Sequence, residues 1–222
     1  PSDGDRFLNM EDYIEGYLDT VVDKVRERTG CDQINILGYC MGGSMSAMYA
    51  ALHPEKVKNL ILLAAPVDWS NREYLLAKWT DASVFDVDKL MQVYGNAPAE
   101  LLQGSFQLLK PVSTLVEKYF TFYENMEDEK FLEDFFAMET WLNDNIPVAG
   151  EMFRQFVKYC MQQNLLIQGK LRIGERIVDL RKIVCPVLNL TATQDHLVPP
   201  ELSLPFNDAV GSTDRKSINF PA

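Results

Sequence analysis

Residues 38–43 read Gly-Tyr-Cys-Met-Gly-Gly, and this stretch decides the fold of the chain. The apolar run 34–37 precedes it and predicts a short strand, while the small residues over 42–53 predict a helix that Pro54 ends. A strand, a glycine-bounded turn and a helix in this order are typical of a nucleophile elbow, G-x-nucleophile-x-G. Cys40 is therefore the predicted nucleophile.

The spacing of this elbow has a physical reason. The turn holds the nucleophile in strained backbone geometry, so Gly38 and Gly42 are expected to be small to let strand and helix approach closely. The positive end of the helix then favours a thiolate or an oxyanion at Cys40. We expect the backbone N–H of Met41 to be one oxyanion donor. The alternative interpretation is a buried structural cysteine in a tight turn.

Outside the elbow, the chain alternates predicted helices and strands. A helix is predicted over 9–28, with Asn9 as its N-cap and Gly30 as its stop. The run 60–65 is apolar throughout, as in strands that a parallel sheet buries on both faces. Two later strands are predicted at 187–192 and 216–220. The apolar stripe expected on the helix 9–28 consists of Tyr13, Ile14, Tyr17, Leu18, Val21, Val22 and Val25.

This pattern divides the chain into three parts. Residues 1–69 and 181–222 are expected to form an α/β core, and residues 70–180 a mainly helical cap insertion. One apolar stripe in the insertion predicts a helix that packs into a core, or alternatively lines an apolar acyl channel. Its members are Phe131, Leu132, Phe135, Phe136, Met138, Trp141 and Leu142. The acidic run 124–134 predicts a solvated helix start.

An elbow nucleophile requires an acid and a histidine later in the chain. Asp195 follows the strand predicted at 187–192, and its alternative role is that of a turn residue. His196 adjoins it, but neighbouring side chains in an extended segment point apart, so we assign His196 a supporting position next to the acid. His53 lies at the far end of the elbow helix, about 18 Å from Cys40 at 1.5 Å per residue. We therefore expect the general base to lie beyond Ala222.

Composition excludes several other classes. The 222 residues carry 21 Lys and Arg against 32 Asp and Glu, a net charge of −11, which argues against nucleic acid or an anionic membrane surface as partner. No apolar run is long enough for a membrane span, and residues 1–13 do not form a signal peptide. The four cysteines form no metal motif and no disulfide framework, which indicates reduced cytosolic thiols and no metal site.

Together, these segments resemble the catalytic region of polyhydroxyalkanoate synthases, and the class III and class IV types resemble it best. The resemblance covers essentially the whole chain in order. It implies an α/β-hydrolase fold, with Cys40 as nucleophile and Asp195 as acid, and a catalytic His in a Gly-His motif after the last strand. The matching segments are GYCMGG (38–43), YAALHPEKVKNL (49–60), PVD (66–68), GNAP (95–98), LKP (109–111), WLND (141–144), Tyr159 with NL (164–165), GKL (169–171), VDL (178–180) and DHLV (195–198).

The resemblance also implies an activity: polymerisation of short-chain 3-hydroxyacyl-CoA thioesters into polyester with release of CoA, through an acyl-cysteine. It implies no cofactor, since the CoA thioester is the substrate. The implied partners are the growing polyester and its granule surface in the cytoplasm, a second synthase subunit and a second copy of the chain. Two alternatives remain: a cysteine-type α/β hydrolase, such as a thioesterase or dienelactone hydrolase, and an inactive granule-binding member of the family.

The missing histidine and the absence of earlier strands make an internal fragment, truncated at both ends, the expected reading of this chain. Such a fragment is expected to be inactive. We further expect strand 60–65 to lie unpaired at a sheet edge, which would lower solubility.

Overall fold

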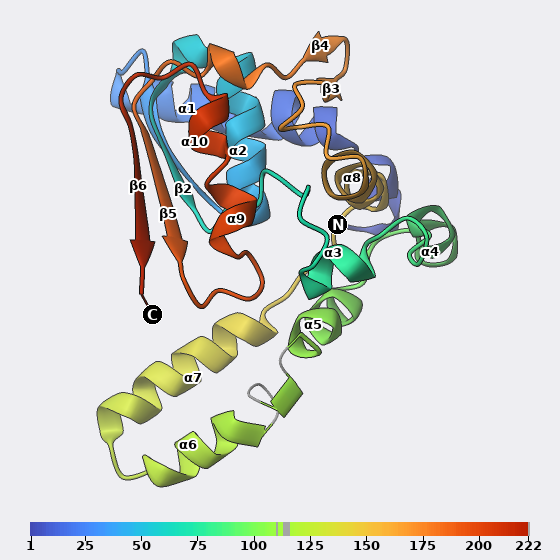
Figure 1. The fold of residues 1–222 in the computed structure, drawn as a ribbon, viewed down its shortest axis with the longest axis vertical. Coiled ribbons are helices and arrows are strands. Elements are labelled where there is room, and N and C mark those ends of the chain that lie inside the picture. Colours follow the sequence, from blue (N-terminus) through green and yellow to red (C-terminus); the bar gives the residue numbers. More distant parts are fainter. Residues whose placement is uncertain (110, 113–115, 222) are drawn as a thin grey trace.

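A four-stranded parallel sheet in the order β1-β2-β5-β6 forms the centre of the computed structural model (Figure 1). The structure describes residues 1–109, 111–112 and 116–221; Lys110, in one of the matching segments, and Ala222 lie outside the described residues. The strands span β1 Ile34–Tyr39, β2 Val57–Leu63, β5 Val187–Ala192 and β6 Arg215–Phe220. Each predicted strand is therefore present.

Strand β2 lies in the interior of the sheet. Leu60 pairs with Ile36 of β1 and with Val187 of β5, so its backbone has a neighbour on both sides. The expectation that the run 60–65 is an unpaired edge is therefore wrong. The edges are β1 and β6, because the segment returning from the insertion adds β5 beside β2 instead of extending the sheet beyond it.

Within the described part of the chain, helices cover one face of the sheet. Helices α2 (Met41–Leu52), α9 (Pro200–Ser203) and α10 (Phe206–Ala209) lie on that face in Figure 1. On it, Leu60 and Leu62 are fully buried. The opposite face keeps large apolar side chains exposed: Leu37, Tyr39, Leu63, Ile218 and Phe220. Strand β2 is thus buried on one face, and the prediction that both of its faces are buried is wrong.

The first helical segment also departs in part from its prediction. It consists of a wide helical turn, η2 (Asp12–Leu18), that continues into α1 (Asp19–Thr29). Asn9 accepts hydrogen bonds from the next turn, and Gly30 ends α1 with a φ of 66°, both as predicted. Within the stripe, Ile14 and Val22 are buried, but Tyr17, Val21 and Val25 are exposed. The segment lies at the periphery, so only a narrow strip of it reaches the core.

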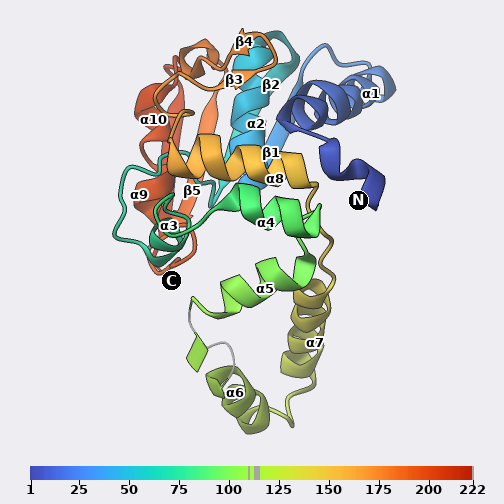
Figure 2. The ribbon, with the colours of Figure 1, turned by 90° about the vertical axis from the view of Figure 1, so that its right-hand side faces the viewer.

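The segment between β2 and β5 is mostly helical. Figure 2 shows α4 and α8 side by side with α5 below them, and Figure 1 shows α6 and α7 as an antiparallel hairpin at the far end. The remaining elements are η1 Asp3–Phe7, η3 Pro54–Lys56, α3 Leu75–Trp79, α4 Val87–Tyr94, α5 Ala99–Gln107, α6 Lys118–Glu124, α7 Glu129–Asn143, α8 Gly150–Gln155, η5 Phe156–Gln162, β3 Arg172–Ile173, β4 Arg176–Ile177 and η6 Leu180–Lys182.

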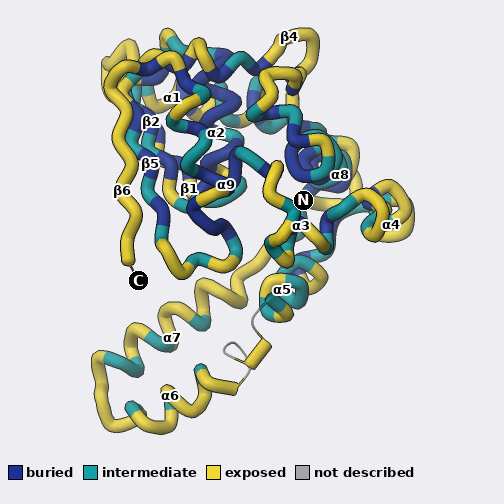
Figure 3. The backbone as a smooth tube through the Cα atoms, viewed as in Figure 1, coloured by how far each residue is buried: buried dark blue, intermediate teal, exposed yellow. Residues whose placement is uncertain are grey.

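The stripe predicted as helix core lies on α7, and the structure does not bury it. Phe122 of α6 packs against Phe135 at 4.7 Å between ring centroids, and Lys118 pairs with Glu139 at 2.9 Å. No residue of α7 is buried, and Figure 3 shows the hairpin almost wholly exposed. The prediction of a packed core helix is wrong, because a two-helix hairpin has no third layer to cover its remaining apolar face. Among the described residues, no helix combines the length and apolar character that crossing a membrane requires.

The acidic run is divided between three elements. It includes the end of α6, the connecting turn and the first turns of α7. The carboxylate of Asp128 caps α7 by accepting from the N–H groups of Lys130 and Phe131 at 2.9 and 3.1 Å. The predicted solvated helix start is present at α7.

Candidate active site

Cys40 occupies the turn between β1 and α2 in a conformation that few residues adopt. Its φ is 52° and its ψ −125°, a strained combination for a residue with a Cβ. The turn is held on both sides: the Cys40 N–H donates to the Leu63 carbonyl at 3.0 Å, and the Cys40 carbonyl accepts from Gly43 N–H at 2.9 Å. The local geometry is that of a nucleophile elbow, as the sequence predicted.

The close approach of strand and helix is made by Gly38 and Gly43. A Cβ on Gly38 would lie 2.5 Å from the Gly43 Cα, and a Cβ on Gly43 would lie 2.4 Å from the Ala65 Cβ. A Cβ on Gly42 would meet no atom within 4 Å. The prediction that Gly42 must be small for this contact is wrong, because the first turn of α2 points Gly42 away from the strand and Gly43 toward it.

Alanine at positions 42 and 43 is therefore expected to have opposite effects on stability. Gly43→Ala forces the helix away from Ala65 and should lower the free energy of unfolding by about 1–3 kcal/mol. Gly42→Ala should leave it unchanged or raise it by up to about 1 kcal/mol, because alanine is the better helix former. Urea unfolding of both variants measures this, and equal effects at the two positions would contradict the assignment.

Burial governs the electrostatics of the nucleophile. The Cys40 side chain is half-buried, and this burial raises the pKa of its thiol. The Met41 N–H, donating to the sulfur, lowers that pKa, whereas the charge of Asp195 raises it again. The helix start therefore assists the thiolate, as expected, but burial outweighs it. A thiol of this kind depends on a general base to attack at neutral pH.

The reactivity of Cys40 in the 222-residue chain is therefore expected to rise steeply with pH. Only the thiolate is alkylated, and below the thiol pKa its fraction grows about tenfold per pH unit. With the pKa of Cys40 above its ordinary value, alkylation by iodoacetamide should increase through pH 7 to 9 without a plateau. Peptide mass spectrometry after timed labelling measures the rate, and a plateau below pH 8 would show a depressed pKa instead.

Asp195 lies in the turn that follows β5. Its Oδ1 accepts from the N–H groups of Leu197 and Val198, both at 2.9 Å, so the residue also has the turn-forming role considered as the alternative. Both of these bonds use the same carboxylate oxygen. Since β1 and β5 are parallel and flank β2, Cys40 and Asp195 follow the same edge of the sheet, close enough for the carboxylate charge to act on the thiol.

The structure places His53 far from these two residues. His53 lies at the opposite end of α2, where its Nε2 contacts Glu15 Oε2 at 2.7 Å and its ring stacks on Tyr49. It has a structural role at a helix end, as the sequence indicated. His196 directly follows Asp195 in the same turn.

Comparison with known proteins identifies the fold. A family profile described as alpha/beta hydrolase fold matches residues 1–219. The chain belongs to this family. A monoacylglycerol lipase from Paleococcus ferrophilus aligns with a TM-score of 0.54 and 16% identity, over 96% of this chain and 65% of the lipase. An alpha/beta fold family hydrolase from Bacillus anthracis aligns with a TM-score of 0.51 and 13% identity, over 96% of this chain and 68% of the hydrolase.

Among α/β hydrolases, the chain is similar to polyhydroxyalkanoate synthases, which confirms the resemblance found in the sequence. It is 46% identical to poly(3-hydroxyalkanoate) polymerase subunit PhaC of Haloferax mediterranei, over 98% of this chain and 44% of the relative. It is 42% identical to the Allochromatium vinosum subunit of the same name, over 100% of this chain and 62% of the relative. The chain thus spans about half the length of these relatives.

Sequence analysis missed the segment that joins the two candidate residues. Residues 64–69 leave the end of β2 and run between α2 and α9: the Ser44 hydroxyl donates to the Pro66 carbonyl at 2.5 Å, and Val67 N–H donates to the Leu202 carbonyl at 2.7 Å. The sequence shows the motif at 66–68, but spacing along the chain does not reveal these contacts.

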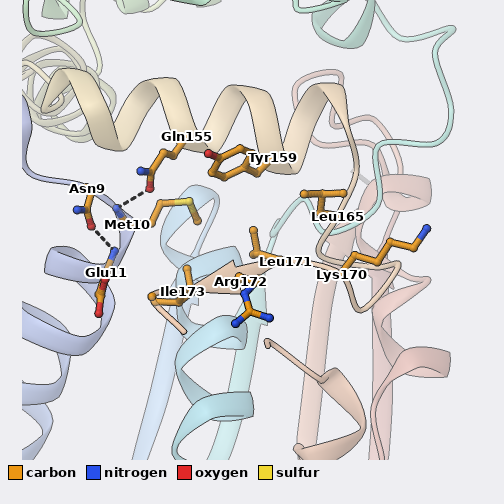
Figure 4. A pocket seen from close by; sticks show the side chains of 11 residues that line it. Asn9, Met10, Glu11, Gln155, Tyr159, Leu165, Lys170, Leu171, Arg172 and Ile173 are labelled. Atoms are coloured by element: carbon orange, nitrogen blue, oxygen red, sulfur yellow. Dashed lines mark hydrogen bonds between the residues drawn. The ribbon is translucent and has the colours of Figure 1, made fainter. Parts of the chain in front are cut away.

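A pocket of about 410 Å³ lies away from Cys40, between the start of η2, the α8–η5 helix and β3 (Figure 4). Lys170 and Arg172 are at one side of it and apolar side chains line much of the rest. Its polar groups are used within the chain: the Met10 N–H donates to Gln155 Oε1, and the Arg172 guanidinium donates to the Glu175 carbonyl. We assign it no role in the reaction.

Proposed function

We propose that the protein containing this chain polymerises 3-hydroxyacyl-CoA thioesters into polyester, with release of CoA. The observation that carries the proposal is the strained cysteine at the elbow, Cys40, in a chain similar to PhaC over nearly all its length. Cysteine suits this chemistry: its attack on a thioester exchanges one C–S bond for another, and the acyl-cysteine stays reactive enough for a hydroxyl to attack.

The proposed roles follow from the positions of the residues. Cys40 takes the acyl group and the Met41 N–H stabilises the oxyanion. Asp195 orients a histidine that removes the proton from the thiol or from the attacking 3-hydroxyl. His53 lies at the wrong end of α2 for that base. His196 directly adjoins the acid, where we assign it a supporting position, so we propose that a residue outside this chain supplies the base. The insertion, proposed as a cap over 70–180, would keep water from the acyl-cysteine.

The remaining features of the proposal come from the similarity to the synthases. No cofactor is needed, since the CoA thioester supplies the acyl group and the driving force. We propose short-chain monomers, a second synthase subunit, pairing with a second copy, and a place in the cytoplasm at the polyester granule. The printed names of the relatives, as subunits of a polymerase, support a multi-subunit enzyme.

The test is a product assay with 3-hydroxybutyryl-CoA. The full-length protein is expected to release CoA and to form a methanol-insoluble polyester. CoA release with free 3-hydroxybutyrate as the only product would instead establish a thioesterase-like hydrolase. No CoA release at all, with retained binding to polyester particles, would establish the inactive granule-binding alternative. The 222-residue chain, assayed beside it, is expected to show no turnover; turnover would make His53 or His196 the base.

A further inference from the structure

We propose that Asn164 is a positioning residue, which clasps the two ends of the helical insertion and so holds Cys40 and Asp195 in register. The clasp joins Asn164 to Asp68 and Trp69, and Asn164 lies ninety-six positions after Asp68 in the chain. The inference rests on the proposed use of Cys40 and Asp195 in catalysis, and it is tested below by a measurement that needs no catalysis.

The clasp consists of two hydrogen bonds of opposite direction. The Asn164 side-chain N–H donates to Asp68 Oδ1 at 2.7 Å, and the Asn164 side-chain oxygen accepts from the Trp69 backbone N–H at 2.9 Å. Asp68 Oδ1 also accepts from the Ser70 N–H at 2.9 Å. Asn164 is 7% exposed, so water does not replace these bonds. A side chain here must be both donor and acceptor.

The backbone explains the choice of asparagine further. Asn164 has a φ of 54°, the left-handed region that few residues other than glycine, asparagine and aspartate occupy at low cost. It lies just after the C-cap of η5, Gln163. Asparagine therefore meets two requirements at one position, the backbone turn and the pair of hydrogen bonds.

From the clasp, rigid contacts lead to both candidate catalytic residues. Toward Cys40, Pro66 accepts from the Ser44 hydroxyl, and the backbone next to it, at Ala65, packs against Gly43 in the first turn of α2. Toward Asp195, the Val67 and Asp68 N–H groups both donate to the Leu202 carbonyl, at 2.7 and 2.9 Å.

The segment between β2 and the clasp is therefore pressed between the helix of the nucleophile and α9, which begins just after the acid turn. At its inner end, Ala64 is hydrogen-bonded to Leu190 of β5, and at its outer end Trp69 is hydrogen-bonded to Asn164. If the outer end moves, the contacts with both helices move with it.

A second tie makes the clasp testable without unfolding the protein. The Arg72 guanidinium donates to the Gln162 carbonyl at 2.7 Å, and the Gln162 side chain donates to the carbonyls of Thr80 and Phe85. These bonds also join the outgoing and returning ends of the insertion. Loss of Asn164 alone should therefore loosen the base of the insertion without detaching it.

Three variants separate the clasp from general effects. Asn164→Asp keeps the size, the left-handed backbone and the acceptor for Trp69, but it sets a carboxylate against Asp68. Asp68→Asn keeps both bonds, since an amide oxygen also accepts from the Ser70 and Asn164 N–H groups, although without the added strength of a charged acceptor. The double variant Asp68→Asn/Asn164→Asp restores a donor–acceptor pair between the two side chains with the roles exchanged. It weakens the bond to the Ser70 N–H, because both wild-type bonds end on the one oxygen Oδ1.

The cysteines of the chain supply the readout. Cys31 is exposed and serves as the reference for iodoacetamide alkylation; Cys160 is buried, and burial raises the pKa of its thiol to about 12, so it reacts only on unfolding. Cys40 reports the site. In Asn164→Asp the ratio of the Cys40 rate to the Cys31 rate should rise about fivefold or more, since a loosened elbow admits water and the reagent. Cys160 should stay protected.

The double variant is expected to reverse at least half of that rise in the ratio, and Asp68→Asn is expected to keep the ratio within about twofold of the wild type. In the full-length protein, kcat for CoA release should fall about tenfold in Asn164→Asp and recover in the double variant. An unchanged Cys40 ratio, labelling of Cys160 in step with Cys40, or no recovery in the double variant would each overturn the proposal. Because labelling requires no turnover, a protein without polymerase activity would still decide the role of Asn164.

Discussion

Cys40→Ala is expected to reduce CoA release from 3-hydroxybutyryl-CoA by at least about 10⁴-fold in the full-length protein, because the acyl group then has no acceptor. The substitution removes one half-buried sulfur atom and the bond that it accepts from the Met41 N–H, but it leaves the backbone–backbone hydrogen bonds that hold the elbow. The fold should therefore persist. Thiol release and polymer yield, measured with circular dichroism as a check on folding, are the tests.

Two further variants sharpen this prediction. Cys40→Ser should lose most of the activity, since a hydroxyl carries far less anionic character near pH 7 than a thiol. Cys31→Ser is the matched control, because that thiol is exposed and lies outside the elbow, and it should leave activity unchanged. Normal polymerisation by Cys40→Ala would show that the elbow has another role.

Asp195→Asn should lower the same activity by about 10³–10⁴-fold, because it removes the charge that orients and stabilises a protonated histidine. The amide oxygen can still accept from the N–H groups of Leu197 and Val198, so the turn after β5 should keep its shape. The loss would then report the charge and not the turn. The measurement is the rate of elongation at saturating substrate.

His196→Gln is the companion variant for Asp195. It changes the neighbouring residue in the same turn, and it should reduce activity by less than about tenfold if His196 only supports the acid. Equal losses at positions 195 and 196 would instead make His196 the general base. A loss at Asp195 that is no larger than that of an ordinary surface substitution would reduce the residue to its turn-forming role.

Local sequence determined those parts of the candidate site that are formed by residues close together in the chain. A strand, a tight turn and a helix within twenty residues predicted the strained backbone of Cys40, because the steric demands of an elbow act over a few residues. The same holds for Asp195 after β5 and for Gly30 at the end of α1. Each of these features depends on the local backbone conformation, which residue propensities and the spacing of apolar and capping residues predict.

Tertiary structure alone decided which parts of the chain meet. It made Gly43, and not Gly42, the glycine against Ala65, because that choice depends on the angle at which α2 crosses the strand. It left the aromatic stripe of α7 exposed, because periodicity shows that a helix has an apolar face but not what lies against it. It also joined Asp68 to Asn164. The pairing of residues so far apart in the chain comes from the path of the whole insertion, and no local pattern encodes that path.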